Sequence, residues 1–240
     1  MNSLQVLDAL VDIYDTMELQ QDNQQYYANI NPELARSVVR CQPSNVLEVG
    51  CGAGALGAFF KGQNESIRWD GIEFFPSAAQ EAAAVLDNVT EGAVEDVDLD
   101  ALAATYDTIV MGDVLEHLVN PWKVLKDLAR ILKRRGKLCV SVPNINHWTI
   151  FATLGQGRFT YADSGLLDRT HLRFFTRSEL TQAIQAAGLK IQAVESVINP
   201  HPRMDEFITQ YVKFQDSIGL HNPALAEEMR TFQWVITATK

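Results

Sequence analysis

Three closely spaced glycines follow a short apolar segment that contains a single acid. The segment 46–49 includes Glu48, and Gly50, Gly52 and Gly54 come directly after it. Glycine has no Cβ, so such a turn can bend sharply and bring backbone N–H groups close to a ligand. The residues that follow can form a helix whose N-terminus adds partial positive charge at the same place. The pattern predicts a site for a nucleotide-like cofactor.

A second acid ends the next apolar segment. Glu73 closes the predicted strand 67–72 and is followed by Phe74. A carboxylate at this position can accept two hydrogen bonds from a ribose diol, and an aromatic ring beside it can stack on an adenine face. The alternative is an acid that only water solvates.

Apolar segments and helical segments alternate along the chain. This alternation is typical of a mainly parallel sheet covered by helices on both faces, so we predict a doubly wound α/β fold. Ligands of such sheets bind outside the carboxyl ends of the strands. The last two strands lack the βαβ rhythm and could pair antiparallel at the edge. The predicted strands are 46–49, 67–72, 89–92, 106–112, 137–142, 190–198 and 232–239.

Helix signals separate these strands. Asn120 and Pro121 predict the start of one helix as N-cap and first residue, and Gly136 predicts its end after a basic turn. We expect a single domain with four parts, which are an N-terminal helical cap over 1–44, a cofactor-binding core over 45–199, a helical insertion over 200–231 and a last strand over 232–240. The insertion could cover the substrate mouth or supply a homodimer contact.

Composition excludes several classes of function. The 240 residues carry 30 acids and 20 Lys or Arg, for a net charge of −10, so a large nucleic-acid footprint is not expected. The N-terminus is typical of an amphipathic helix rather than a signal peptide, and no apolar run is long enough for a membrane span. Cys41, Cys51 and Cys139 lack metal-ligand spacing, which predicts a cytoplasmic protein with no metal site.

Together these motifs resemble a known family. VLEVGCGAG, then GIEFFP, then the segment from YDTIVMGDVLEH to VPN is similar to the class I S-adenosylmethionine-dependent methyltransferases. Within them the chain resembles the small-molecule O-methyltransferases that carry V-L-E-H after the fourth strand. Glu48 fits the family pattern E/D-x-G-x-G-x-G, and the final strands fit an antiparallel hairpin. The resemblance implies a Rossmann-like, seven-stranded sheet with an antiparallel last strand.

The resemblance also implies where S-adenosylmethionine would bind. Glu48 would support the glycine turn, Glu73 would hold the ribose hydroxyls, and Gly112 and Asp113 would line the methionine end. The residues implied to cradle the methionine portion and ribose are Gly50, Cys51, Gly52 and Gly54.

At the adenine the chain departs from the family pattern. Ala93 stands where an Asp commonly meets the exocyclic amine. Glu95 would substitute for that Asp, with the N–H of Val94 reaching the ring. Tyr27, ahead of the first strand, would close over the methionine end as N-terminal helices do in this family.

Histidines are the candidates for a base that activates a hydroxyl acceptor, a role worth about 10²–10⁴-fold in rate. His171 lies in a stretch that resembles the family's H-x-R-F-F-T motif over the substrate cleft, and His147 follows the fifth strand. Arg169 and Arg173 flank His171 and suit an anionic substrate, or else they are surface arginines paired with acids. His117 is expected to have a structural part.

We predict a methyltransferase that acts on a hydroxyl of a small molecule, preferably a saccharide or its precursor, with a quinone or phenol as the alternative. An NAD-dependent oxidoreductase is a second class, because Gly52, Gly54 and Gly57 spell G-x-G-x-x-G. Glu48 and the lack of a Tyr-x-x-x-Lys pair after the fifth strand speak against it. A third class, suggested by Ala93, is a cofactor-binding protein without catalysis.

Overall fold

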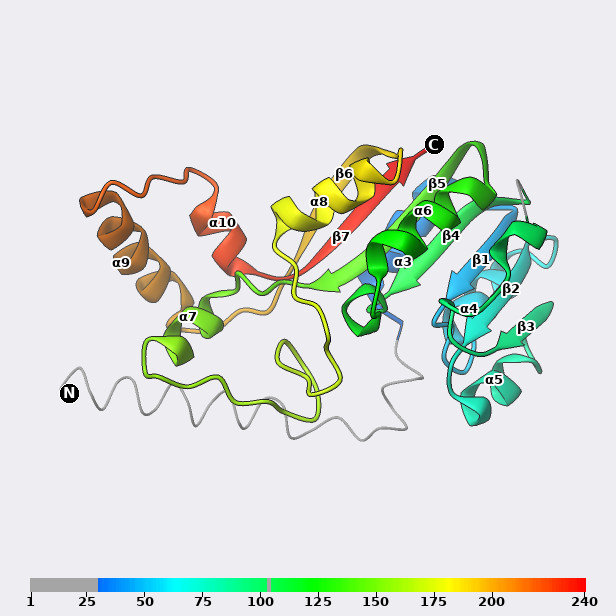
Figure 1. The fold of residues 1–240 in the computed structure, drawn as a ribbon, viewed down its shortest axis with the longest axis horizontal. Helices are drawn as coiled ribbons and strands as arrows, with labels where there is room; N and C mark the ends of the chain where they lie inside the picture. The colour runs from blue at the N-terminus through cyan, green and yellow to red at the C-terminus, as the bar shows by residue number, and fades with distance from the viewer. Residues whose placement is uncertain (1–29, 103–104) are drawn as a thin grey trace.

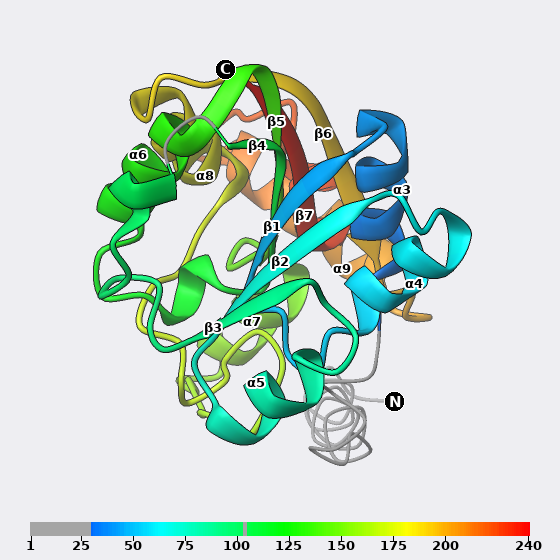
Figure 2. The same cartoon turned by 90° about the vertical axis from the view of Figure 1, so that its right-hand side faces the viewer.

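The computed structural model describes residues 30–102 and 105–240. These residues form a seven-stranded sheet with the order β3-β2-β1-β4-β5-β7-β6, twisted between layers of helices (Figures 1 and 2). The predicted doubly wound α/β fold is therefore confirmed. The strands are β1 (Asn45–Val49), β2 (Arg68–Glu73), β3 (Asn88–Glu91), β4 (Tyr106–Gly112), β5 (Leu132–Pro143), β6 (Lys190–Ile198) and β7 (Thr231–Thr239).

The strand directions place the candidate residues at one edge. The strands from β3 to β5 pair in parallel, whereas β7 is antiparallel to both β5 and β6, as expected. β1 pairs with β2 on one side and with β4 on the other, so the winding of the chain reverses between β1 and β4. Such a reversal opens a ligand crevice outside the carboxyl ends of the strands. The chain leaves these ends through Gly50, Phe74 and Asp113.

Helices cover both faces of the sheet. α3 and α4 pack on one face, and α6 and α8 pack on the other (Figure 2). The helices are α3 (Pro32–Cys41), α4 (Ala55–Gln63), α5 (Pro76–Ala82), α6 (Pro121–Ile131), α7 (Trp148–Leu154), α8 (Arg177–Ala186), α9 (Met204–Ser217) and α10 (Leu225–Arg230), with 3-10 turns η1 (Leu99–Leu102) and η2 (Leu115–His117).

Strand β4 shows how the two faces divide the core. Ile109 and Met111 belong to the cluster under α6 and α8, whereas Val110 between them belongs to the cluster under α3 and α4. Successive side chains of a strand point to opposite faces. Because both faces are covered, the central positions Ile109, Val110 and Met111 are all apolar and fully buried, which explains the continuous apolar run in the sequence.

Helix α6 ends earlier than predicted. Asn120 caps its start, since its Oδ1 accepts the N–H of Lys123 at 3.1 Å. The helix stops at Ile131, so the predicted end at Gly136 is wrong. Leu132 is already extended and pairs with Tyr106 of β4. Its side chain is buried in the core, and that burial outweighs the helix propensity of the basic residues behind it.

A small lobe lies beyond the carboxyl end of β5. It consists of α7, α9 and α10 (Figure 1) and has its own apolar core, which includes Trp148, Ile208 and Met229. Asn144 joins it to the sheet, because its Nδ2 donates to the carbonyl oxygens of Glu228 and Thr231, both at 2.7 Å. Across the described residues we find no helix with the length and apolarity that a membrane crossing requires.

Candidate active site

The glycine turn after β1 depends on glycine in two ways. Gly50, Gly52 and Gly54 have φ values of 71°, 53° and 82°, a region that residues with a Cβ rarely adopt. A Cβ on Gly50 would lie 2.5 Å from Cγ2 of Val114, and one on Gly54 would lie 2.7 Å from Cγ2 of Val85. The turn is therefore a backbone cradle that glycine alone allows, because a side chain at Gly50 or Gly54 would collide with Val114 or Val85.

Glu73 at the end of β2 holds this turn. Its Oε2 accepts the N–H of Gly52 at 2.8 Å, and its Oε1 accepts the N–H of Phe75 at 2.9 Å. Each carboxylate oxygen has two lone pairs, so each can also accept a ligand hydroxyl. The side chain is only 5% exposed, and hydrogen bonds there are stronger than in water. The position fits the predicted ribose contact and adds a role in shaping the turn.

Glu48 and Cys51 point away from the crevice and into the sheet. Oε2 of Glu48 accepts the indole N–H of Trp69 at 2.7 Å, which joins β1 to β2. Burial raises the pKa of Glu48 to about 8, against the lowering effect of that hydrogen bond. A Cβ on Gly71 would lie 2.5 Å from Sγ of Cys51, so the Cys51 side chain packs on β2. Only its backbone could face a cofactor.

The residues predicted to enclose adenine differ in exposure. Phe74 is 63% exposed and meets Phe75 edge to face at 5.2 Å, so its ring can stack on a ligand. The Val94 side chain is buried in the core. The Glu95 carboxylate accepts the N–H groups of Val119 and Asn120 at 3.2 and 2.8 Å. It thereby holds the start of α6, and its contact with the exocyclic amine stays a prediction.

Asp113 is the centre of a hydrogen-bonded group at the end of β4. It has a φ of 53°, and its Oδ1 accepts from Oγ of Ser141 at 3.2 Å and from Nε2 of Gln233. Burial raises the pKa of Asp113 to about 6, although both hydrogen bonds lower it. The preceding Gly112 lies under α3, where a Cβ would come within 3.0 Å of Leu34. The sequence did not single out Gln233, because its place follows from the β5–β7 pairing.

His147 is deeply buried. It is 3% exposed, its Nδ1 lies 2.8 Å from Oγ1 of Thr149, and its ring meets Phe232 at 5.5 Å. Burial lowers the pKa of His147 to about 3. An imidazole with so low a pKa is a weak proton acceptor at neutral pH. This leaves His171 as the remaining candidate for the base.

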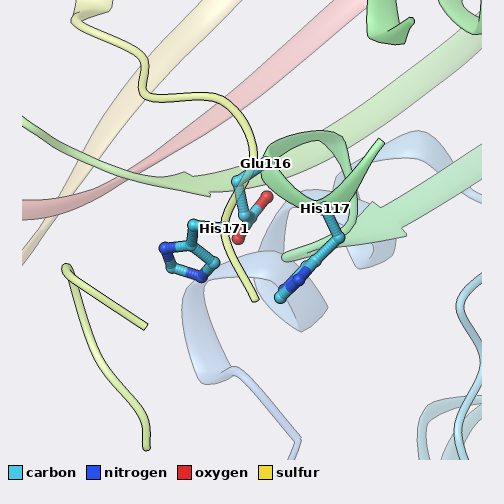
Figure 3. A group of neighbouring side chains, drawn as sticks. All are labelled: Glu116, His117 and His171. Carbon is cyan, nitrogen blue, oxygen red and sulfur yellow. The ribbon is translucent and has the colours of Figure 1, made fainter. Parts of the chain in front are cut away.

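His171 lies beside His117. The Glu116 carbonyl oxygen accepts the N–H groups of Leu172 and Arg173 at 2.8 and 2.9 Å, which fixes the loop before α8 against η2. The two imidazole rings are 4.8 Å apart. Burial lowers the pKa of both histidines, and the charge of His117 lowers the pKa of His171 further. Figure 3 shows both rings with the Glu116 side chain next to them.

Glu116 is a residue that the sequence did not assign. It is 1% exposed, and neither carboxylate oxygen accepts a hydrogen bond from another residue within the described ranges. Burial, followed by the charge of Asp113, raises the pKa of Glu116 well above its usual value. The available signal was the acid of V-L-E-H itself, which stands next to the buried Leu115 in an apolar turn.

The arginines near His171 do not gather at one point. The exposed Arg169 pairs with Asp163 at 2.5 Å. Arg173 donates to the carbonyl oxygen of Val119 and lies 5.9 Å from the centre of the Trp122 ring. The alternative of a surface arginine paired with an acid therefore holds for Arg169, whereas the partners of Arg173 are carbonyl oxygens and an aromatic ring. Their contact with an anionic substrate stays a prediction.

Exposed aromatic rings border His171. Phe174 lies 6.3 Å from the imidazole and 6.0 Å from Phe159, which in turn lies 5.5 Å from Tyr161. These three aromatic residues are 36%, 39% and 52% exposed, so part of each is accessible to a ligand. Tyr27, predicted to close over the methionine end, lies outside the described residues.

Known proteins share this sequence and this fold. The ubiquinone biosynthesis O-methyltransferase of Coxiella burnetii is 26% identical over 189 residues, covering 74% of this chain and 78% of that protein. The protein of the same name from Burkholderia thailandensis is 28% identical over 174 residues, covering 68% and 71%. The S-adenosylmethionine-dependent methyltransferase structure from Mesorhizobium loti matches with a TM-score of 0.57 at 16% identity, covering 87% and 96%. That likeness shows the fold.

The model of the family described as "Methyltransferase domain" matches residues 20–194. The match spans more than half of the chain and includes the glycine turn, Glu73, Asp113 and the loop of His171. It removes the dinucleotide oxidoreductase as an alternative, because Gly52, Gly54 and Gly57 lie within the match to a methyltransferase family. The chain belongs to the class I S-adenosylmethionine-dependent methyltransferases.

Proposed function

We propose that this methyltransferase methylates a hydroxyl on a small aromatic molecule, such as a phenol or hydroquinone. The observation that carries the proposal is the position of His171 beside the exposed ring of Phe174, which begins a row of exposed rings that continues through Phe159 to Tyr161. Aromatic faces attract a flat acceptor, and a histidine at its edge can take a proton. The name of the curated relatives, ubiquinone biosynthesis O-methyltransferase, supports the aromatic acceptor over the saccharide that the H-x-R-F-F-T motif suggested.

The chain's own residues fit S-adenosylmethionine at the crevice. The backbone cradle of the glycine turn would hold the methionine portion, the carboxylate of Glu73 the ribose and the ring of Phe74 the adenine. When bound, the cofactor supplies a methyl group already activated on a sulfonium. Glu48 would not contact it, because its carboxylate is hydrogen-bonded to Trp69 inside the sheet. The residues that would contact it, with Cys51 and Val94 doing so through their backbone, are Gly50, Cys51, Gly52, Gly54, Glu73, Phe74, Val94, Glu95, Gly112 and Asp113.

Catalysis would then depend on positioning and on one proton acceptor. Alignment of acceptor oxygen, methyl carbon and sulfur can lower the barrier by about 7–11 kcal/mol. Nδ1 of His171 lies 3.3 Å from the carbonyl oxygen of Leu166. A carbonyl oxygen only accepts, so Nδ1 carries the hydrogen and Nε2 keeps a free lone pair. Nε2 of His171 can therefore take the proton of the acceptor hydroxyl.

The test measures cofactor binding and methyl transfer separately. Calorimetry should show saturable binding of S-adenosylhomocysteine and none of NADH. Labelled methyl transfer is then measured with catechols and hydroquinones, and with nucleotide sugars and free saccharides as the second group. A carboxylated phenol and its uncharged analogue test the contribution of Arg169 and Arg173.

Transfer to phenolic acceptors only is the expected result. Transfer to saccharides only would overturn the acceptor class and restore the sugar alternative. Tight binding of S-adenosylhomocysteine with no transfer to either group would favour a cofactor-binding protein without catalysis.

A further inference from the structure

Three side chains with donor atoms for metals meet next to the carboxyl end of β4. One possible ligand atom from each of Glu116, His117 and His171 lies within 4.8 Å of the other two. Glu116 and His117 come from η2, and His171 comes from the loop before α8 (Figure 3). The two segments are held together by the backbone hydrogen bonds to the Glu116 carbonyl oxygen. The cluster is therefore fixed by the fold and not by the side chains alone.

Hydrogen bonds orient the ring of His117. The N–H and the hydroxyl of Thr170 both donate to Oδ1 of Asp168, at 2.7 and 2.6 Å. The hydroxyl hydrogen of Thr170 is therefore already donated to Asp168. Oγ1 of Thr170 can then only accept from Nδ1 of His117, which lies 3.1 Å away. This leaves the Nε2 lone pair of His117 free. A histidine ligand whose second nitrogen donates to a fixed partner is the usual arrangement around protein metals.

His171 has the same tautomer. Its Nδ1 hydrogen is directed to the carbonyl oxygen of Leu166, so its Nε2 lone pair is also free. The centres of the two rings are 4.8 Å apart, and both residues are partly exposed. The cluster thus offers two neutral nitrogen donors with access from solvent on one side.

Glu116 supplies the observation that a packing role leaves unexplained. Its carboxylate is buried, directed toward the two rings, and accepts no hydrogen bond from another described residue. A buried polar group without a partner costs roughly 1–3 kcal/mol, and a charged one costs more. Asp113 and Asp168 act on the same carboxylate as further negative charges. A cation beside Glu116 would give its carboxylate a partner and would balance the negative charge of the three acids.

We propose that Glu116, His117 and His171 bind a divalent first-row transition-metal ion such as Zn²⁺, Mn²⁺, Fe²⁺ or Co²⁺. Two imidazoles and one carboxylate suit these ions, whereas Mg²⁺ and Ca²⁺ prefer oxygen ligands alone. Ligand atoms around one tetrahedral ion are about 3.3 Å apart, so the side chains would close by up to about 1.5 Å on loading. Three protein ligands leave a position open for water or for the hydroxyl of an acceptor.

Metal binding would change the chemistry proposed for His171. A nitrogen that binds the ion cannot also take a proton, so the ion itself would lower the pKa of a bound hydroxyl. The metal proposal does not require methyl transfer, because metal binding is measured without cofactor or acceptor. Failure of one proposal therefore leaves the other standing.

The first experiment titrates the chelator-stripped full chain with Co²⁺ and with Zn²⁺ by calorimetry and visible absorption. One ion per chain and a Co²⁺ spectrum without thiolate charge transfer are expected, since Cys41, Cys51 and Cys139 are outside the cluster. Glu116→Gln, His117→Gln and His171→Gln should each abolish saturable binding. His221→Gln, an exposed histidine beyond α9, is the matched control and should bind as the wild type does.

A variant of Thr170, the hydrogen-bond partner of His117, tests the site in a second way. Thr170→Val removes the acceptor of the His117 N–H and should weaken binding about 10–100-fold, whereas Thr170→Ser should restore it. Crystals soaked with Zn²⁺ need no variant, and an anomalous map should place the ion among the three side chains. An ion found elsewhere, no saturable binding, or equal binding by the three Gln variants would overturn the proposal.

Discussion

At the residue scale, Glu73 has a structural role, and we propose a binding role for the same carboxylate. Its carboxylate holds the N–H groups of Gly52 and Phe75, and we place the ribose on the same oxygens. Glu73→Ala should weaken the binding of S-adenosylhomocysteine by about 1–3 kcal/mol, because hydrogen-bonding partners lose their acceptor. This corresponds to roughly 5–150-fold in Kd, which calorimetry can measure.

The neighbouring strand provides the control for that substitution. Glu91 ends β3 directly opposite Glu73 but is exposed. Glu91→Ala should leave the affinity unchanged. Equal affinity of the Glu73→Ala variant and the wild type would remove Glu73 from the cofactor site.

The two candidate histidines are separated by their burial. His171→Ala should lower turnover by about 10²–10⁴-fold while the affinity for S-adenosylhomocysteine stays the same, because the lost side chain serves the acceptor hydroxyl, as its base or as a ligand of the proposed metal ion, and not the cofactor. His147→Ala should instead lower the free energy of unfolding by about 2–4 kcal/mol, since a buried ring that packs on Phe232 is removed. Steady-state kinetics and urea unfolding of both variants distinguish these outcomes. If His171→Ala keeps normal turnover and His147→Ala has none, the role of the base belongs to His147.

Residues next to strand ends were predictable, and those that depend on distant contacts were not. Gly50, Glu73 and Asp113 directly follow or end apolar strands, so their place at the crevice can be read from neighbouring positions. Gln233 reaches Asp113 only because β7 pairs with β5. Glu116 meets His171 only because a loop far along the chain returns to η2. Local patterns carry no information about such contacts.

At the element scale, the contact of α4 with β2 explains Gly57. A Cβ on Gly57 would lie 2.3 Å from Cδ2 of Leu86 and 2.7 Å from Cδ1 of Trp69. Gly57→Ala should therefore lower the free energy of unfolding by about 1–3 kcal/mol through overpacking. The third glycine of the apparent dinucleotide pattern thus serves close packing of helix and strand.

The same helix contains the control. A Cβ on Gly62 would meet nothing within 4 Å. Gly62→Ala should raise the free energy of unfolding by up to about 1 kcal/mol, because alanine is the better helix former. Urea unfolding of both variants gives the comparison. If Gly57→Ala is as stable as Gly62→Ala, the close approach is not present in solution.

Element types could be predicted more reliably than their ends. The strands were visible as apolar runs because both faces of the sheet are covered. The end of α6 was not visible, because Gly136 and the basic turn look like a helix C-terminus while Leu132 is required in the core. Tertiary burial decided the boundary there.

At the scale of the whole molecule, several buried groups make stability depend on pH. Burial raises the pKa of Glu48 from 4.5 to about 8 and lowers that of His147 from 6.5 to about 3. Between pH 4.5 and 8 the folded state keeps the Glu48 proton that the unfolded state loses, so the unfolding free energy falls as pH rises. Neutral His147 acts in the opposite direction, but only below about pH 6.5. Burial also lowers the pKa values of His117, His171 and His201, and the effect of all four histidines fades above pH 6.5. A comparison of the wild type with a Glu48 variant between pH 6.5 and 8 therefore isolates the contribution of Glu48.

Glu48→Gln tests this dependence, since its amide oxygen can still accept the N–H of Trp69. One retained proton changes the unfolding free energy by about 1.4 kcal/mol per pH unit, so the wild type should lose about 2 kcal/mol more than the variant between pH 6.5 and 8. Glu116 contributes in the same direction and keeps the slope of the variant negative. Urea unfolding at pH 6.5, 7.25 and 8 measures both slopes, with Glu91→Gln as an exposed control expected to follow the wild type. Parallel slopes for wild type and Glu48→Gln would mean that Glu48 is already ionised in the folded protein, with its charge balanced by the indole N–H alone.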